Sequence, residues 1–456
     1  MLSLRLSEVA LWTRGTLHGA DAPVRGVSTD SRKVGADELF VALKGEHHDG
    51  HEHLAQAAER GASGALVMRR VNSDLPQVVV ADTLLALGDL ASAVRAKRRA
   101  RVVGITGSNG KTTVKTLTAS ILQRHGRTHS NAGNFNNEIG LPLSLLSMPQ
   151  DSEYAVMEMG AGKPGDIAYL AAIARPEIGL VNNIAPAHLE RMRTLEGVAE
   201  TKGALYQALP ADGTAIINAD DAFADFFAGL AGSRRVLRFG FSAKADARAD
   251  DIRLEPERST FMLVTPAGAH EVQLPLPGRH NVGNALAAAA IAHALDVPLA
   301  TIVEGLQNAP LVGGRLRRQV APGGWSVIDD SYNANPGSTA AAIATLALQS
   351  GERWLVLGDM AELGTDAAAL HAQIGKQAHD AGIEKLFAVG TLSAHAARAF
   401  GVNAQHFATQ VELIAALRMQ LHAGLSVLVK GSRSSAMENV VAALLGGDGG
   451  GARHAA

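Results

Sequence analysis

The stretch from Arg101 to Thr113 reads R-V-V-G-I-T-G-S-N-G-K-T-T, and a helix-like run from Val114 to Gln123 follows it. A short β-branched strand that leads into glycines, a lysine and two hydroxyl groups before a helix is typical of a seat for nucleotide phosphates. The glycines let backbone N–H groups approach the phosphates, Lys111 supplies a positive charge, and the hydroxyl of Thr112 can hold Mg²⁺. The stretch therefore predicts a phosphate loop, and we expect these residues to bind the nucleotide: Gly107, Ser108, Asn109, Gly110, Lys111, Thr112 and Thr113.

This loop departs from the general pattern G-x-x-x-x-G-K-[ST], because Ile105 stands where the pattern has its first glycine. The shorter form T-G-S-N-G-K-T-T remains, from Thr106 to Thr113. A glycine-rich turn without a ligand is the alternative interpretation. Because the Lys-Thr-Thr triplet stands at the start of the expected helix, we favour phosphate binding.

The composition narrows the class of protein. A chain of 456 residues is too long for one ordinary core, and about 150 residues per domain predicts three domains. The 42 Lys and Arg residues nearly balance the 44 Asp and Glu residues, so we expect no nucleic-acid partner. The chain has no cysteine, which excludes disulfides and thiolate nucleophiles and fits a reducing cytoplasm. The most apolar helical run, Ala285 to Leu295, is too short to span a membrane, so we expect no membrane span.

The first unit, residues 1–99, contains two polar loops that are richer in functional groups than packing requires. These are Ser28 to Arg32 and Lys44 to His51. Four histidines lie between His47 and His53, but zinc sites usually spread their ligands over two elements, so a polar or ligand-facing loop is favoured over a metal site. The strands and helices that we expect here are Glu38–Leu43, Gly64–Met68 and Gln77–Val80, and Leu54–Arg60 and Leu84–Val94.

The second unit, residues 100–312, alternates strands with helices, which predicts a parallel sheet. Its strand Tyr154–Met157 ends in Glu158, at the position where such folds place a Mg²⁺ ligand beside the phosphate strand. By their own pattern, His188 would most often be a surface histidine and Lys202 a solvated helical lysine. The remaining elements that we expect are the strands Ile178–Ile184 and Thr214–Asn218, antiparallel strands within 252–274, and the helices Thr194–Leu209 and Ala285–Leu295.

The third unit, residues 313–456, again places polar residues after its strands, which indicates a doubly wound sheet with a ligand crevice. The expected strands are Trp325–Ile328, Trp354–Leu357, Lys385–Val389 and Ser426–Val429. The glycine-rich tail after about residue 446 should be disordered. The predicted fold class is thus α/β with three domains: a small α/β domain, a central parallel-sheet P-loop ATPase domain and a C-terminal Rossmann-like domain.

Several separated motifs together resemble the Mur ligase family, the ATP-dependent enzymes that form amide bonds in bacterial cell-wall synthesis. The motifs are T-G-S-N-G-K-T-T, G-N-F-N-N-E-I-G, E-M-G, N-N-I-A-P-A-H-L-E, G-R-H-N-V-G-N, D-D-S-Y-N-A-N-P, G-D-M-A-E-L-G and K-G-S-R-S-S-A-M-E. The resemblance covers nearly the whole chain except the tail. The short phosphate loop is that family's own variant, so the departure at Ile105 supports the resemblance.

The resemblance implies roles for the central residues. It implies that Lys111 holds the β- and γ-phosphates of ATP and that Thr112 binds a first Mg²⁺. Glu158 and His188 resemble ligands of a second Mg²⁺, and Lys202 matches a lysine that is carbamylated in this family. Together with Lys111, these three residues form the expected catalytic set.

The resemblance also implies nucleotide and substrate contacts. Asn281, with an asparagine of the 134–137 loop such as Asn137, is expected to contact adenine. Arg315 is expected to close over the nucleotide, and Asp330 to bind the ribose. The expected substrate-binding residues are Ser31, Arg32, Lys44 and Gly45, as an anchor for the uridine nucleotide, and Asn333, Asn335, Lys430, Ser432 and Arg433.

The reaction that the resemblance implies adds D-Ala-D-Ala to UDP-N-acetylmuramoyl tripeptide through an acyl phosphate, in a monomer. The alternatives are a sibling ligase that adds one amino acid, or folylpolyglutamate synthase. The Asp-Asn-Pro-Arg box of the diaminopimelate-adding sibling is absent, and Gly358 to Gly364 matches the dipeptide-adding branch. A P-loop NTPase switch is a further alternative, but it would need the strict loop pattern. A non-catalytic nucleotide-binding module is disfavoured, because every charged position that the family uses is filled in this sequence.

Overall fold

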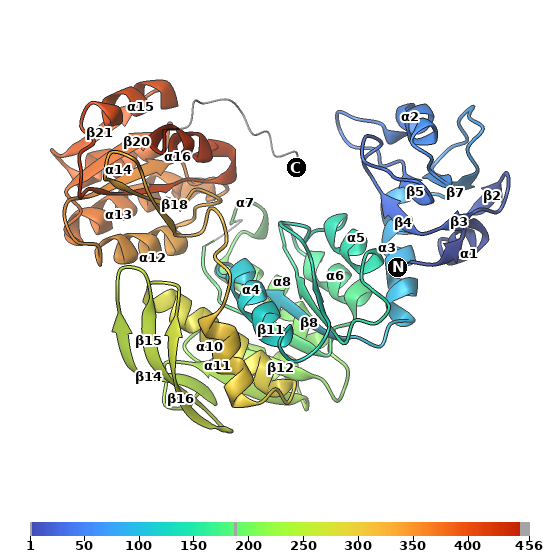
Figure 1. Cartoon of the computed structure of the whole chain (residues 1–456), viewed down its shortest axis with the longest axis horizontal. Helices are drawn as coiled ribbons and strands as arrows, with labels where there is room; N and C mark the ends of the chain where they lie inside the picture. The colour runs from blue at the N-terminus through green and yellow to red at the C-terminus, as the bar shows by residue number, and fades with distance from the viewer. Residues whose placement is uncertain (1, 187–188, 447–456) are drawn as a thin grey trace.

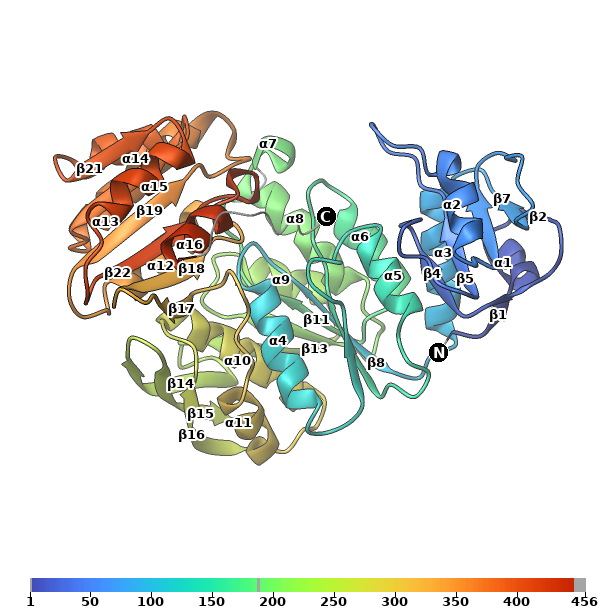
Figure 2. The same cartoon turned by 45° about the horizontal axis from the view of Figure 1, so that its top comes forward.

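The computed structural model describes residues 2–186 and 189–446. Within them, successive parts of the chain form three large sheets of five, nine and six strands. Figures 1 and 2 show the first sheet at one end of the molecule, the third at the other, and the central sheet between them. The predicted three-domain α/β class is confirmed, whereas the exact boundaries at 99 and 312 stay a prediction. The tail after residue 446 and His188 lie outside the described residues.

The first sheet has the strand order β2-β7-β6-β5-β4 and is parallel except for β2. Its strands are β2 (Thr16–His18), β4 (Gly26–Ser28), β5 (Glu38–Val41), β6 (Gly64–Val67) and β7 (Gln77–Val79). The three predicted strands are confirmed, each shorter than expected. The predicted helix at Leu54 is also present, as α2 (Leu54–Glu59).

Helix α3 (Thr83–Ala96) connects the first unit to the central one. Asp82 caps it by accepting hydrogen bonds from the N–H groups of Leu84 and Leu85. Its apolar face packs against α6 (Asp166–Ala174) in one shared core. Gly88 allows this contact, because a Cβ there would lie 2.3 Å from the hydroxyl of Tyr169.

The central sheet has the order β16-β15-β14-β13-β12-β11-β8-β10-β9, and its phosphate-loop strand β8 (Arg101–Thr106) lies between β10 and β11. The register pairs Glu158 with Ile105, so the predicted carboxylate leaves the sheet beside the loop. The neighbouring strands are parallel from β9 to β14, and β15 is antiparallel to both β14 and β16, in agreement with the antiparallel strands predicted within 252–274. The bounds are β9 (Thr128–Ser130), β10 (Tyr154–Glu158), β11 (Ile178–Val181), β12 (Thr214–Asn218), β13 (Arg235–Gly240), β14 (Ala247–Leu254), β15 (Ser259–Thr265) and β16 (Gly268–Leu274).

Two helices lie against each other on one face of this sheet, α4 (Lys111–Leu122) and α10 (Arg279–Ala294). The alanines of α10 are buried in the core, and their small side chains let the helices approach closely. Helix α10 begins earlier than the predicted Ala285, because Gly278 turns the chain with a φ of 93°. Asn281 therefore lies in the first turn of the helix and not in a loop.

The third sheet has the order β17-β18-β22-β19-β20-β21, with only β17 antiparallel. Alternate strand residues enter two separate cores: Leu355 belongs to one, and Trp354 and Val356 to the other. Helices therefore cover both faces, and the doubly wound prediction is confirmed. The strands are β17 (Arg317–Val320), β18 (Ser326–Asp330), β19 (Arg353–Gly358), β20 (Lys385–Val389), β21 (Ala404–Phe407) and β22 (Ser426–Lys430).

Within residues 2–186 and 189–446, none of the helices combines the length and the apolar character that crossing a bilayer requires.

Candidate active site

The phosphate loop leaves β8 and enters α4 at Lys111, so the helix begins earlier than the predicted Val114. Gly107 and Gly110 take left-handed backbone conformations, with φ of 144° and 79°. A Cβ at Gly110 would lie 2.3 Å from Oδ1 of Asn284. Glycine is therefore required at position 110 both by the turn and by the close approach.

The backbone N–H groups of the loop fall into two sets. Ser108 donates to the carbonyl of Asn183, and Asn109 donates to its Oδ1, each at 2.9 Å. The first N–H groups of α4, from Gly110 to Thr113, have no acceptor within the helix and lie at its positive end. These groups are therefore the ones available to an anion, and any nucleotide contact of Ser108 or Asn109 must use other atoms and stays a prediction.

Lys111 folds back over the loop. Its Nζ donates to the carbonyls of Gly107 at 2.9 Å and of Ser108 at 3.4 Å. Burial lowers the pKa of Lys111, although the nearby carboxylate of Glu158 opposes this effect. A phosphate oxygen is a stronger partner for this ammonium than either carbonyl, because the hydrogen bond would join opposite charges.

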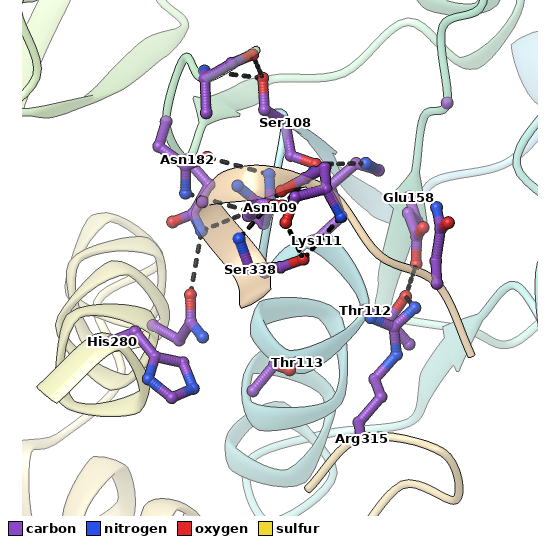
Figure 3. Close-up of a pocket in the computed structure, with 18 of the residues that line it drawn as sticks. Ser108, Asn109, Lys111, Thr112, Thr113, Glu158, Asn182, His280, Arg315 and Ser338 are labelled. Atoms are coloured by element: carbon purple, nitrogen blue, oxygen red, sulfur yellow. Dashed lines mark hydrogen bonds between the residues drawn. The ribbon is translucent and has the colours of Figure 1, made fainter. Parts of the chain in front are cut away.

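Glu158 is buried beside the start of α4 (Figure 3). Its Oε2 accepts a hydrogen bond from the hydroxyl of Thr112 at 2.9 Å, and its Oε1 accepts one from Nδ2 of Asn136 at 2.8 Å. Burial raises the pKa of this carboxyl, but the charges of Lys115 and Lys111 outweigh burial, so the pKa lies below its ordinary value. Glu158 is thus ionised next to the phosphate loop.

Lys115 is a residue of this site that we did not predict. It follows Lys111 by one helical turn and therefore lies on the same face of α4. Its ammonium is buried 3.4 Å from Oε2 of Glu158. The available signal was the spacing of the two lysines, which we did not use because a helical lysine is usually solvated.

The third unit supplies Arg315, whose expected role of closing over the nucleotide stays a prediction. Its Nη2 donates to the hydroxyl of Thr112 at 3.0 Å (Figure 3). Its guanidinium lies 4.4 Å from the ring centroid of Tyr332. Lys430 forms a buried ion pair with Asp330 and donates to the carbonyl of Asn333 at 3.0 Å. Burial raises the pKa of Asp330, and the ammonium of Lys430 opposes this effect.

A cavity of about 740 Å³ lies over the loop between the central and third units. The central unit lines it with the predicted phosphate-loop residues 108–113, Glu158, Asn137 and Asn281. From the third unit it receives predicted residues at the ends of two strands and before a helix: Arg315, Asp330, Asn333, Asn335 and Lys430. Residues far apart in the sequence thus form one site.

Two asparagines expected at adenine are held by local hydrogen bonds. Oδ1 of Asn137 accepts from the N–H groups of Ile139 at 3.3 Å and Gly140 at 2.9 Å. Asn281 donates from Nδ2 to the carbonyl of Pro277 at 2.8 Å. Both residues line the cavity. Their contact with adenine stays a prediction.

Lys202 lies on α8 (Leu195–Gln207) and is only 1% exposed. Among the described residues its ammonium has no hydrogen-bond or ion-pair partner. Burial, with a contribution from the charge of Lys111, lowers its pKa to about 7. A solvated helical lysine is therefore excluded, and a buried amine that is neutral far more often than an ordinary lysine takes its place.

The predicted residues of the first unit are not brought to this cavity. Ser31 donates to Oε1 of Gln56 at 2.7 Å, and Arg32 binds the carboxylate of Asp30. Lys44 and Gly45 lie in a turn in which Gly45 donates to the carbonyl of His48 at 2.8 Å. The first unit, which carries these residues, lies at the opposite end of the molecule from the third unit (Figure 1). The substrate contacts of these residues stay a prediction.

The histidine-rich loop has a structural explanation. His51 is buried, its Nδ1 lies 2.5 Å from Oδ1 of Asp49, and its Nε2 accepts from the N–H of Met68 at 2.8 Å. In the third unit, Ser432 donates its N–H to the carbonyl of Asp359, and Arg433 pairs with Glu438 at 2.8 Å. Neither Ser432 nor Arg433 lines the cavity, in contrast to the neighbouring Lys430.

A phosphate loop that faces an arginine from a separate domain defines a nucleotide-dependent enzyme built from three α/β domains. Three family models match the chain: "Mur ligase family, catalytic domain" over residues 23–103, "Mur ligase middle domain" over 105–292, and "Mur ligase, glutamate ligase domain" over 314–433. The chain therefore belongs to the Mur ligase family and is an ATP-dependent ligase.

Individual relatives are similar over the full length. UDP-N-acetylmuramoyl-tripeptide–D-alanyl-D-alanine ligase of Escherichia coli is 46% identical over 97% of this chain and 99% of its own. The structure of MurF from Acinetobacter baumannii has a TM-score of 0.92 and 36% identity, and the match covers 98% of this chain and 99% of that one. The MurF ligase from Thermotoga maritima in complex with ADP has a TM-score of 0.83 and 26% identity, over 93% of this chain and 97% of that one.

Proposed function

We propose that this protein joins D-Ala-D-Ala to UDP-N-acetylmuramoyl tripeptide with ATP, in peptidoglycan precursor synthesis. The observation that carries the proposal is the hydrogen bond from Arg315 to Thr112, because it joins the third unit to the phosphate loop beside Glu158. Such a site suits a reaction whose substrates arrive on different domains and whose intermediate must be kept from water. The names of the full-length relatives support this choice of substrates.

The first chemical step overcomes repulsion between two anions. The γ-phosphoryl group passes from ATP to an oxygen of the tripeptide's terminal carboxylate: the P–O bond to the leaving ADP breaks, and a new P–O bond forms in an acyl phosphate. Lys111, Arg315 and the N–H groups at the start of α4 are proposed to neutralise the phosphate charge, which their positions at the loop support. These fixed positive groups are the protein's main contribution to this step.

The donors beside the loop fit Mg²⁺. The hydroxyl of Thr112 and the carboxylate of Glu158 are hard oxygen ligands of the kind that Mg²⁺ prefers. We propose Thr112 as a ligand of a first ion and Glu158, with His188, as ligands of a second. When bound, the two ions would neutralise further negative charge on the phosphates.

Lys202 would support the second ion only in a modified form, because an ammonium repels a cation. We propose that its amine reacts with CO₂ to give a carbamate, which is an anion. The observations that support this are its burial, the lack of a partner among the described residues, and a pKa of about 7, which leaves much of the amine neutral and nucleophilic. A ¹³C-carbamate signal after incubation with labelled bicarbonate tests the modification. Plain lysine density in a crystal, with full activity of Lys202→Ala at low bicarbonate, would contradict it.

In the second step the amine of the dipeptide attacks the carbonyl carbon of the acyl phosphate. The tetrahedral intermediate then breaks its C–O bond to phosphate, and with loss of one proton from the nitrogen it gives the amide and inorganic phosphate. Asn333 and Lys430 line the cavity from the third unit and are proposed to position the incoming substrate. Asn335 also lines it, but Ser338 and Asn109 engage both ends of its amide, so a substrate contact of Asn335 stays a prediction. Closure of this unit keeps water away from the acyl phosphate.

The test is phosphate release with ATP and UDP-N-acetylmuramoyl tripeptide, with D-Ala-D-Ala, single amino acids and folate substrates offered in turn. We expect turnover only with the dipeptide. Turnover with a free amino acid would favour a sibling ligase, and release without any acceptor would favour an NTPase. We further propose that the protein acts in the cytoplasm, which the lack of cysteine supports. We also propose that it is a monomer, and sedimentation in solution tests this oligomeric state.

A further inference from the structure

Asn335 of the third unit donates a hydrogen bond to Asn109 in the middle of the phosphate loop. The distance from its Nδ2 to Oδ1 of Asn109 is 2.7 Å. Helix α12 (Pro336–Leu346) starts at this point, and a Cβ at Gly337 would lie 3.1 Å from Nδ2 of Asn109. Figure 3 shows Ser338, in the first turn of α12, close to Asn109 and Lys111. The start of α12 therefore lies directly against the loop.

The orientation of the Asn335 amide is set by the helix that it caps. Its Oδ1 accepts from the N–H of Ser338 at 2.9 Å, and the hydroxyl of Ser338 accepts from the N–H of Asn335 at 3.1 Å. This reciprocal capping box occupies the oxygen of the amide and leaves the NH₂ group to point outward. Asn335 thus has a donor, and not an acceptor, to offer to Asn109.

Asn109 receives this bond on its side chain, because its backbone groups are engaged by the central unit. Its N–H donates to Oδ1 of Asn183, and its carbonyl accepts from Nδ2 of Asn182 at 2.9 Å and of Asn183 at 3.1 Å. The backbone of Asn109 is therefore held by the loop after β11, while its side chain faces the third unit. One residue of the phosphate loop joins both units.

The same set of amides continues toward the start of α10. Asn182 donates to Oδ1 of Asn284 at 2.9 Å, and Asn284 donates to Oδ1 of Asn281 at 3.2 Å. Asn182, Asn284 and Asn281 are all buried. Buried amide networks of this kind hold their members in one geometry when each group is satisfied. Asn109 is the point at which this network meets the third unit.

We propose that Asn335 is a positioning residue for phosphoryl transfer. By its hydrogen bond to Asn109 it holds α12 against the phosphate loop, so that the loop takes its reactive geometry when the third unit closes. The inference goes beyond the proposed function and rests on it only for the turnover measurement. Asn335 acts through Asn109 and through Arg315, which closes over the loop from the same unit.

The decisive variant is Asn335→Asp. The carboxylate keeps an oxygen for the N–H of Ser338, so the cap is preserved, but it has no donor for Asn109. Asn109→Ala is its partner in a double-mutant cycle, because it removes the acceptor and keeps every backbone contact of residue 109. Thr409→Asp is the matched control, since Thr409 caps α15 (Gln410–Arg418) in the same domain, far from the loop in the sequence, and gains the same charge.

We expect Asn335→Asp to lower kcat about tenfold with KM for ATP changed less than about twofold, because an acceptor is left facing an acceptor while the contacts at α4 persist. In the Asn109→Ala background the same change should cost less than about twofold. Thr409→Asp should turn over at the wild-type rate. Equal losses in both backgrounds, or an unchanged kcat in Asn335→Asp, would overturn the proposal.

Hydrogen–deuterium exchange of the peptide 107–113 provides a readout that does not depend on ligation. We expect faster exchange in Asn335→Asp than in the wild type, and equal exchange in Thr409→Asp. If the wild type fails to ligate the dipeptide but this difference in exchange is found, the proposed function is wrong, whereas the proposed role of Asn335 in holding α12 to the loop is supported. If the wild type ligates the dipeptide but neither the exchange nor the double-mutant cycle shows coupling between Asn335 and Asn109, the proposed role of Asn335 is wrong, whereas the proposed function is supported.

Discussion

Nζ of Lys115 lies 3.4 Å from Oε2 of Glu158, and both side chains are buried. The same ammonium donates to the carbonyls of Asn131 at 2.9 Å and Gly133 at 3.1 Å. One buried charge therefore joins α4, the loop after β9 and the end of β10. A buried ion pair of this kind contributes mainly by preventing either charge from being left alone.

Replacing Lys115 with Met should destabilise the fold, because Glu158 loses its nearest countercharge. We expect the free energy of unfolding to fall by about 3 kcal/mol, measured by urea denaturation. The double variant Lys115→Met, Glu158→Gln should recover a large part of this loss, since no buried charge then lacks its partner. Equal stability of the single and double variants would contradict this account.

Replacing Lys111 with Ala should abolish ligation without unfolding the protein. Among the described residues the ammonium donates to two loop carbonyls, and its loss leaves Glu158 with the countercharge of Lys115. We expect kcat/KM for ATP to fall by about a thousandfold, since a charge that stabilises the transferring phosphoryl group is lost. Calorimetric titration should still detect the UDP-substrate. Ligation near the wild-type rate would refute the central role of the loop.

Arg315 should contribute through both its charge and its planar shape. Arg315→Ala removes the hydrogen bond to Thr112 and the contact with Tyr332, and we expect kcat to fall about a hundredfold. Arg315→Lys keeps the charge but not the guanidinium geometry, so its kcat should lie between that of the wild type and that of Arg315→Ala. Steady-state phosphate release measures this order. If the Lys variant were no better than the Ala variant, geometry and not charge would be the deciding property.

Acid should destabilise the third unit through His371. This histidine is buried, accepts from the N–H of Met360 at Nε2 (2.9 Å) and donates from Nδ1 to the carbonyl of Ala367 (2.7 Å). The bond at Nε2 requires the neutral ring, because a protonated ring has no lone pair there to accept the N–H of Met360, and burial lowers the pKa of His371. The folded state thus binds fewer protons than the unfolded state, and the stability that His371 contributes is present above about pH 6.5 and lost as the pH falls toward the folded pKa.

The measurement is denaturation at pH 7.5 and 5.5. We expect the wild type to lose stability at the lower pH and His371→Gln, which is already weaker at pH 7.5, to lose less. His125→Gln, at an exposed position, is the control and should keep the wild-type pH dependence. An unchanged pH dependence in His371→Gln would exclude this histidine as the cause.

The parts of the fold that were predictable follow local rules. The phosphate loop was recognised from its glycines and Lys111, and the place of Glu158 beside it follows from adjacent parallel strands, whose ends meet at one edge of a sheet. The starts of α4 and α10 were misplaced, because the two glycines that precede these helices set their entry by left-handed turns. Those turns depend on what the glycine meets in space, such as Asn284 against Gly110.

The sequence by itself determined the class of site: a glycine-rich loop with a lysine and two threonines before a helix has one common use, whatever surrounds it. Only the tertiary structure decided which groups serve it. Lys115 was an ordinary helical lysine until β10 brought Glu158 to it, and Asn109 and Asn335 are joined by a hydrogen bond although distant in sequence. The physical reason is that local pattern encodes backbone conformation, whereas burial, charge pairing and the choice of hydrogen-bond partner arise when separate elements pack together.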